Sequence, residues 1–161
     1  ISDTIEIRSG GALQLASPGR LVGYAAVYNS PSQDLGGFVE QILPGAFNRS
    51  LEKPTNIRAL LEHDPQRLLG RVGSRTLTLQ EDWKGLRFEL SLPDTSYARD
   101  LGVLVERGDI AGCSFGFGAS GSFGPIMTDI TGFAEITPYK GGWCGNDVDP
   151  EILPRAGSRT R

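Results

Sequence analysis

Residues 76–119 read TLTLQEDWKGLRFELSLPDTSYARDLGVLVERGDIAGCSFGFGA and hold the local signals that decide the fold. Residues 76–79 and 86–92 are rich in alternating apolar side chains. Between them, residues 81–85 combine acidic residues, Lys84 and a glycine, a composition typical of a tight turn. This part of the stretch predicts a β-hairpin.

A helix and a further strand follow in the same stretch. Asp94 or Thr95 can cap a helix over residues 96–106, whose apolar face is Leu101, Leu104 and Val105. Gly108 is a typical residue just after a helix end. Residues 113–119 then predict a strand that is interrupted by glycines.

The flanking sequence adds short strand-like segments. Residues 44–52 begin with Pro44 and predict a helical turn, because proline is tolerated at a first helical position. For residues 56–62 we favour a buried strand over a short helix. The strand predictions cover residues 5–8 (a short edge strand), 20–28, 38–43, 56–62 and 131–137.

Composition supports one mostly β (α+β) domain. The 161 residues include 22 glycines and 10 prolines, a turn-rich content that stays below the low-complexity range. The chain is long enough to bury a core without staples. We expect a domain over residues 1–149 and a mobile tail over residues 150–161, which has two prolines, a basic end and no periodicity.

The charge pattern excludes several classes of protein. Apolar residues make up 39% of the chain and the net charge is −3, which argues against disorder and against a nucleic-acid-binding protein. No apolar run approaches the length that spans a bilayer, and no signal peptide is visible. Cys113 and Cys144 form no C-x-x-C pair, so no zinc or redox motif is present and free thiols are favoured over a disulfide. We therefore expect no metal, no cofactor, no nucleic acid and no membrane partner.

Two residues stand out as candidates for chemistry. His63 is the only histidine, and it ends an apolar run just before Asp64 and Pro65. A lone histidine is more often a satisfied structural residue, but this one is predicted to lie where core and surface meet. Ser114 lies in Gly112–Gly116, which fits G-x-S-x-G; in an α/β-hydrolase, however, the histidine follows the serine, whereas His63 precedes it.

A serine hydroxyl needs a base, and histidine suits that task near neutral pH. A third group then has to orient the imidazole. Glu135 is the best placed carboxylate, because Phe133, Glu135 and Thr137 would share one face of an alternating strand. Asp129 and Asp64 are rivals, and an ordinary strand-face role for Glu135 stays open. The glycines near Ser114 leave backbone N–H groups accessible for an oxyanion, although no donor can be named.

Several blocks occur in an order that resembles the HK97-type tailed-phage prohead serine protease family. The first is GYAAVYNSPSQDLGGFVEQILPGAF, and the second is ALLEHDPQRLLGR with the TLTLQEDWKGLRFELSLPDTSYARDL stretch after it. RGDIAGCSFGFGA and, more weakly, ITGFAEITPY complete the set. Together they cover roughly residues 20 to 140. A departure from the family pattern is Cys113, which stands where the family often has methionine.

The resemblance implies a fold, an activity and a partner. The implied fold is assemblin-like: a small antiparallel β-barrel of about six or seven strands flanked by a few helices. The implied activity is a serine endopeptidase that cleaves the phage capsid scaffold or delta segment, and itself, during procapsid maturation. It would act in the interior of the phage procapsid, after synthesis in the host cytoplasm, on the major capsid protein, and as a homodimer or oligomer if it associates.

The family's catalytic positions fall on His63, Ser114 and, less directly, Glu135. The related herpesvirus enzymes use a second histidine as third member, which this chain lacks, so a carboxylate serves or the site is a dyad. Two alternatives remain: a catalytically inactive, scaffold-like capsid-assembly module on the same fold, and a small esterase. Retention of both His63 and Ser114 argues against the inactive module.

Overall fold

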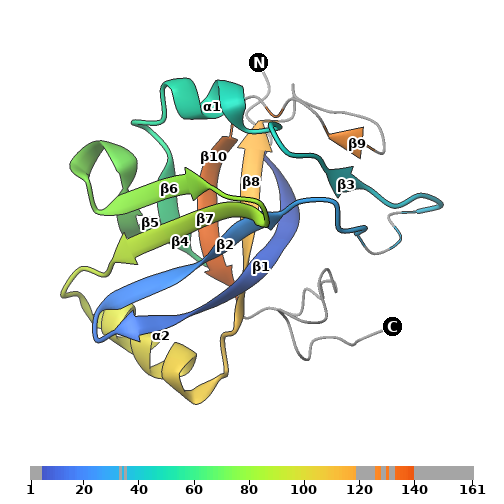
Figure 1. Ribbon diagram of the computed structural model, residues 1–161. Coiled ribbons are helices and arrows are strands. Elements are labelled where there is room, and N and C mark those ends of the chain that lie inside the picture. Colours follow the sequence, from blue (N-terminus) through green and yellow to red (C-terminus); the bar gives the residue numbers. More distant parts are fainter. Residues whose placement is uncertain are drawn as a thin grey trace.

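The computed structural model describes residues 5–32, 34, 36–118, 126–127, 130 and 133–139 (Figure 1). Strands dominate the described part, which confirms the mostly β prediction. The elements are β1 (Ile5–Ser17), β2 (Arg20–Val27), β3 (Gln41–Ile42), α1 (Asn48–Glu52), β4 (Arg58–Leu61), β5 (Asp64–Arg71), η1 (Val72–Ser74), β6 (Leu77–Glu81), β7 (Gly85–Ser91), α2 (Ser96–Arg107), β8 (Gly112–Gly118), β9 (Ile126–Met127) and β10 (Phe133–Tyr139).

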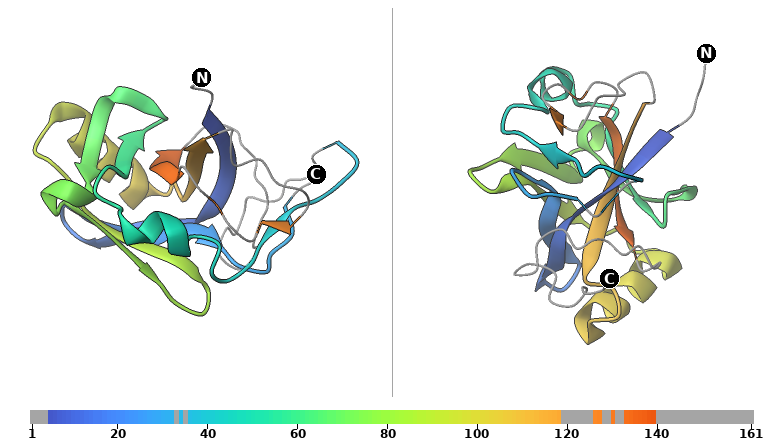
Figure 2. Two further views of the ribbon diagram at one scale, coloured as in Figure 1. Left: turned by 90° about the horizontal axis from the view of Figure 1, so that it is seen from above. Right: turned by 90° about the vertical axis from the view of Figure 1, so that its right-hand side faces the viewer.

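Eight of the strands form one sheet in the order β5-β4-β10-β8-β1-β2-β7-β6. The sheet curls around the core, with α1 and α2 at opposite ends of the curl (Figures 1 and 2). Neighbouring strands are antiparallel except β10 and β4, which pair in parallel. β3 and β9 form a separate parallel pair beside the main sheet. The sheet thus has more strands than we expected, and one parallel pairing.

β1 differs most from its prediction. It spans 13 residues between β8 and β2, so the prediction of a short edge strand at residues 5–8 was wrong. Gly10 and Gly11 lie where β1 changes partner from β8 to β2. A Cβ on Gly10 would lie 2.2 Å from the backbone oxygen of Ala25, so only glycine allows this close approach.

The helix and hairpin predictions from residues 76–119 are confirmed. The Thr95 hydroxyl accepts a hydrogen bond from the Ala98 N–H at the start of α2. Gly108 ends the helix with a positive φ of 87°. In the β6–β7 turn, the Asp82 carboxylate accepts hydrogen bonds from the backbone N–H groups of Lys84 and Gly85.

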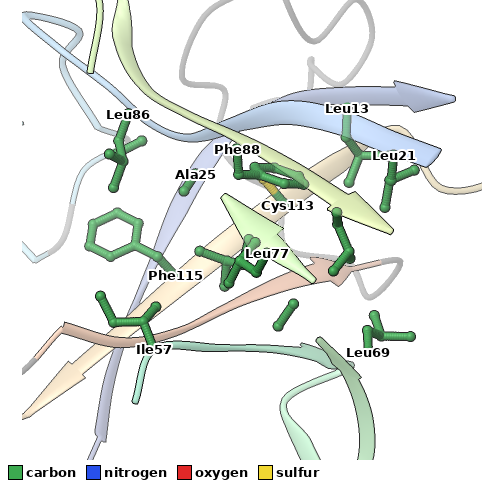
Figure 3. Packing of buried hydrophobic residues seen from close by; sticks show 14 of the residues in the cluster. Leu13, Leu21, Ala25, Ile57, Leu69, Leu77, Leu86, Phe88, Cys113 and Phe115 are labelled. Carbon is green, nitrogen blue, oxygen red and sulfur yellow. The ribbon is translucent and has the colours of Figure 1, made fainter. Parts of the chain in front are cut away.

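The core fills the inside of the curled sheet. Figure 3 shows Cys113 and Phe115 of β8 among buried residues from other strands, including Leu77 and Phe88. Phe115 also packs edge-to-face on Phe47, with ring centroids 5.6 Å apart. Since side chains alternate along a strand, the inward position of Cys113 and Phe115 assigns Ser114, between them, to the opposite face.

An ion pair anchors the segment that precedes β3. The Arg8 Nε lies 2.6 Å from a carboxylate oxygen of Glu40, whose residue is only 5% exposed. The same guanidinium lies over the ring of Phe117, 5.5 Å from its centroid. A buried carboxylate of this kind depends on its partner, so the contact ties this segment firmly to β1.

Two expectations about the chain can be compared with the described residues only in part. In that part, no helix is both long and apolar enough to cross a membrane. Cys113 is a free, buried thiol. Cys144 and the predicted tail over residues 150–161 lie outside the described residues.

Candidate active site

Ser114 lies near the start of β8, the central strand of the site. β8 is flanked by β1 and β10, so its backbone hydrogen-bonding groups are used on both edges. Ser114 lies directly opposite Ser9 of β1 and opposite Thr137 of β10. Both Ser114 and Thr137 are buried, at 3% and 0% exposure. The backbone of Ser114 is therefore fixed by pairing with a strand on each side.

His63 lies in a tight turn between β4 and β5. Leu61 pairs with Asp64, so Glu62 and His63 form a two-residue connection. Both have positive φ, 55° and 59°, as a type I′ turn requires. Glycine and asparagine favour these positions, whereas Glu and His adopt them at a conformational cost. Backbone strain of this kind is common at functional sites, where the surrounding structure holds the residue in place.

The turn brings the imidazole between two hydroxyl groups from neighbouring strands. His63 Nε2 lies 2.6 Å from Ser114 Oγ, although 51 residues separate the two in sequence. The other ring nitrogen, Nδ1, lies 3.2 Å from Thr137 Oγ1. Both ring nitrogens thus have a partner. We predicted the first contact from the sequence, whereas Thr137 entered that reasoning only as a residue on the same face as Glu135.

The predicted acidic partners fall in three different places. The backbone of Glu135 lies in β10, opposite Gly116 and two residues before Thr137. The pairing register shifts between Phe133 and Glu135, so the simple alternation that we expected is interrupted there. The Asp64 carboxylate accepts a hydrogen bond from the Gln66 N–H and lies 3.6 Å from Arg67. Asp129 lies outside the described residues.

Cys113, next to Ser114 in sequence, has a contrasting environment. Its single S–H proton has two acceptors within reach: the backbone oxygen of Tyr24, 2.9 Å from Sγ, and that of Gly11, 3.5 Å from Sγ. Burial raises the pKa of this thiol to about 12. The two neighbouring side chains of β8 therefore differ sharply: one is an inert core thiol, and the other is a hydroxyl beside an imidazole.

A cavity of about 380 Å³ opens between the His63 turn and α2. Its lining includes Leu61 and Glu62, the two residues directly before His63. Apolar residues of α2 contribute further, and Arg67, Ser96 and Asp100 add polar groups. We call this hollow the α2 cavity. Its size suits one or two amino-acid side chains. Among the described residues, no cluster of three or more metal-ligating side chains occurs here or elsewhere.

A buried hydroxyl in contact with an imidazole, whose second nitrogen is held by another group, is the arrangement that serine hydrolases use. Residues 4–127 match the family model described as caudovirus prohead serine protease. The chain therefore belongs to the caudovirus prohead serine protease family. The matched stretch includes His63 and Ser114 and ends before β10. No curated protein and no solved structure matched the chain.

Proposed function

We propose that this protein is a serine endopeptidase in which Ser114 is the nucleophile and His63 the general base. Its substrate is the scaffold or delta segment of a phage major capsid protein, together with its own chain, during procapsid maturation. The observation that carries the proposal is the 2.6 Å contact between His63 Nε2 and Ser114 Oγ. Family membership supports the reaction class and the capsid substrate.

The proposed reaction follows from this contact. Nε2 of His63 takes the hydroxyl proton as Ser114 Oγ attacks the peptide carbonyl carbon. The imidazolium then gives that proton to the leaving amine, and an acyl-enzyme remains on Ser114. A water molecule, deprotonated by the same imidazole, hydrolyses the ester, and the proton returns to Ser114 as the acid product leaves.

We assign Glu135 the role of the acidic partner. Its carboxylate charge would stabilise the imidazolium that forms in each step. Support comes from its place in β10, two residues before Thr137, which contacts His63. A Glu135→Gln substitution retains the size of the side chain and removes its charge, so it tests this role directly.

We further propose that the α2 cavity receives a substrate side chain. It shares Leu61 and Glu62 with the turn that presents His63, so a substrate crossing the site passes its entrance. The apolar residues of its lining, which include Leu61, Leu101 and Ile110, would favour an apolar side chain. The polar groups of Glu62, Arg67 and Asp100 would bind the flanking peptide.

The test is co-expression of this chain with the cognate capsid protein, followed by mass spectrometry of both proteins. Wild-type protein should remove a defined segment and label with a fluorophosphonate probe at Ser114. Ser114→Ala and His63→Ala should abolish cleavage, and Ser91→Ala, at an exposed serine of β7, should not. Cleavage by Ser114→Ala at the wild-type rate would refute the assignment. A wild-type chain that neither cleaves nor labels would instead support the inactive assembly module.

A further inference from the structure

Thr137 makes a contact that the proposed mechanism has not used. Its hydroxyl lies 3.2 Å from His63 Nδ1, the ring nitrogen that faces away from Ser114. Thr137 is fully buried, and it lies directly opposite Ser114 in the β8–β10 ladder. We propose that Thr137 is a positioning residue that fixes the tautomer and the orientation of the His63 ring. This inference rests on the proposed function.

The tautomer decides whether His63 can act as a base. If Nδ1 carries the proton, it donates to Thr137 Oγ1, and the lone pair of Nε2 faces the Ser114 hydroxyl. If Nε2 carries the proton, the lone pair faces Thr137 and Nε2 cannot accept the serine proton. We infer that the threonine oxygen accepts from Nδ1–H, because this is the only arrangement in which both contacts serve proton transfer from Ser114.

The backbone around Thr137 supports this role. β10 pairs with β4, the strand that leads into the His63 turn, at Glu135–Arg58 and Ile136–Ala59. The Glu62 N–H also points to the Pro138 oxygen, 3.5 Å away, directly beside Thr137. β10, which carries Thr137, therefore also pairs with β4, the strand that leads to His63. This pairing fixes Thr137 and His63 relative to each other. In addition, β-branching restricts the rotamers of Thr137, so its hydroxyl stays in place at a low entropic cost.

A neutral hydroxyl differs from a carboxylate in one respect. It can orient the ring, but it supplies no negative charge to the imidazolium. Thr137 and Glu135 therefore have separable effects: loss of the hydroxyl disturbs the tautomer, whereas loss of the charge at Glu135 leaves the tautomer intact and weakens stabilisation of the cation.

The experiment uses nitrogen-15 NMR of the untagged 161-residue chain. Its single histidine makes every imidazole nitrogen signal a signal of His63. At a pH where the ring is neutral, wild-type protein and Thr137→Ser should show a protonated Nδ1 and an unprotonated Nε2. Thr137→Val, which retains the branched shape without the hydroxyl, should show a mixture of tautomers. Its kcat for peptide cleavage should fall roughly 10–100-fold with little change in KM, the range seen when bonds that orient metal-bound histidine rings are lost.

Two results would overturn the inference. One is a wild-type spectrum with the proton on Nε2, which needs no variant and so does not depend on whether Thr137→Val folds. The other is an unchanged tautomer and kcat in folded Thr137→Val. Failure of the proposed function would look different: the wild-type tautomer would be as expected, but Ser114 would not react with the fluorophosphonate.

Discussion

Replacing Ser114 by cysteine would introduce a thiol beside His63, next to the natural thiol of Cys113, which lies in the core. The perturbation is best made in a Cys144→Ser background, so that only these two thiols remain. With its pKa raised to about 12, Cys113 is thiolate in roughly one molecule in 10⁴ at pH 8. A thiol paired with an imidazole commonly has a pKa of about 3.5–7.5 and is mostly thiolate at that pH.

The expected difference in reactivity is smaller than the difference in thiolate content. A thiolate of low pKa is a weaker nucleophile, which offsets roughly two to four of the four orders of magnitude, the more the lower the pKa of the introduced thiol. The introduced thiol should therefore react with iodoacetamide faster than Cys113, by up to about 10²-fold, as measured by peptide mapping over a time course.

His63→Ala provides the matched control for this experiment. In the Ser114→Cys background it should slow labelling of the introduced thiol and leave Cys113 unchanged. Faster labelling of Cys113 than of the introduced thiol would show that the inward and outward faces of β8 are wrongly assigned. Labelling that does not depend on His63 would show that the imidazole does not act on this position.

The further predictions concern stability and substrate choice. Gly102→Ala, in α2 with no neighbour within 4 Å of the new Cβ, should stabilise the protein by about 1 kcal/mol and raise Tm by roughly 2–4 °C. Gly85→Ala should lower Tm sharply, because the new Cβ would lie 2.0 Å from the backbone oxygen of Ala26. Similar Tm values for Gly102→Ala and Gly85→Ala would contradict the close approach of backbone at Gly85. Arg8→Met should lower the free energy of unfolding, measured with urea, by about 3–5 kcal/mol, because it leaves the buried carboxylate of Glu40 without this partner. The double variant Arg8→Met/Glu40→Leu should recover most of that loss. If it does not, the buried charge of Glu40 is not the cause of the loss. Ser96→Trp should narrow the α2 cavity and raise KM or shift the cleavage site without slowing fluorophosphonate labelling; unchanged cleavage would exclude the cavity from substrate binding.

Local signals explain which elements could be predicted from the sequence. Each of these signals acts within a few residues: the cap at Thr95, the glycine after α2 and the turn at Asp82. The local sequence was therefore enough to locate α2 and the β6–β7 hairpin. β1 was mispredicted because its continuation through Gly10 depends on how closely β2 and β8 approach, and this closeness is a tertiary property. The His63–Ser114 pair was predicted because the single histidine and the serine among glycines both fall on the catalytic positions that the family resemblance implies.

The contact between His63 and Thr137 could not be predicted from the sequence, because it depends on a one-residue shift in the pairing of β10 with β8. At the start of β10, Phe133 pairs with Phe117; continued without interruption, that register would bring Ile136 opposite Ser114. The shift between Phe133 and Glu135 adds one residue to β10, so Thr137 takes that place instead. Because side chains alternate with a period of two, this single residue decides whether an apolar group or a hydroxyl lies beside the serine. The alternation of the sequence is the same in either register, so only the ladder between β8 and β10 distinguishes them. The bulge is therefore the feature of the fold that gives the imidazole its second partner.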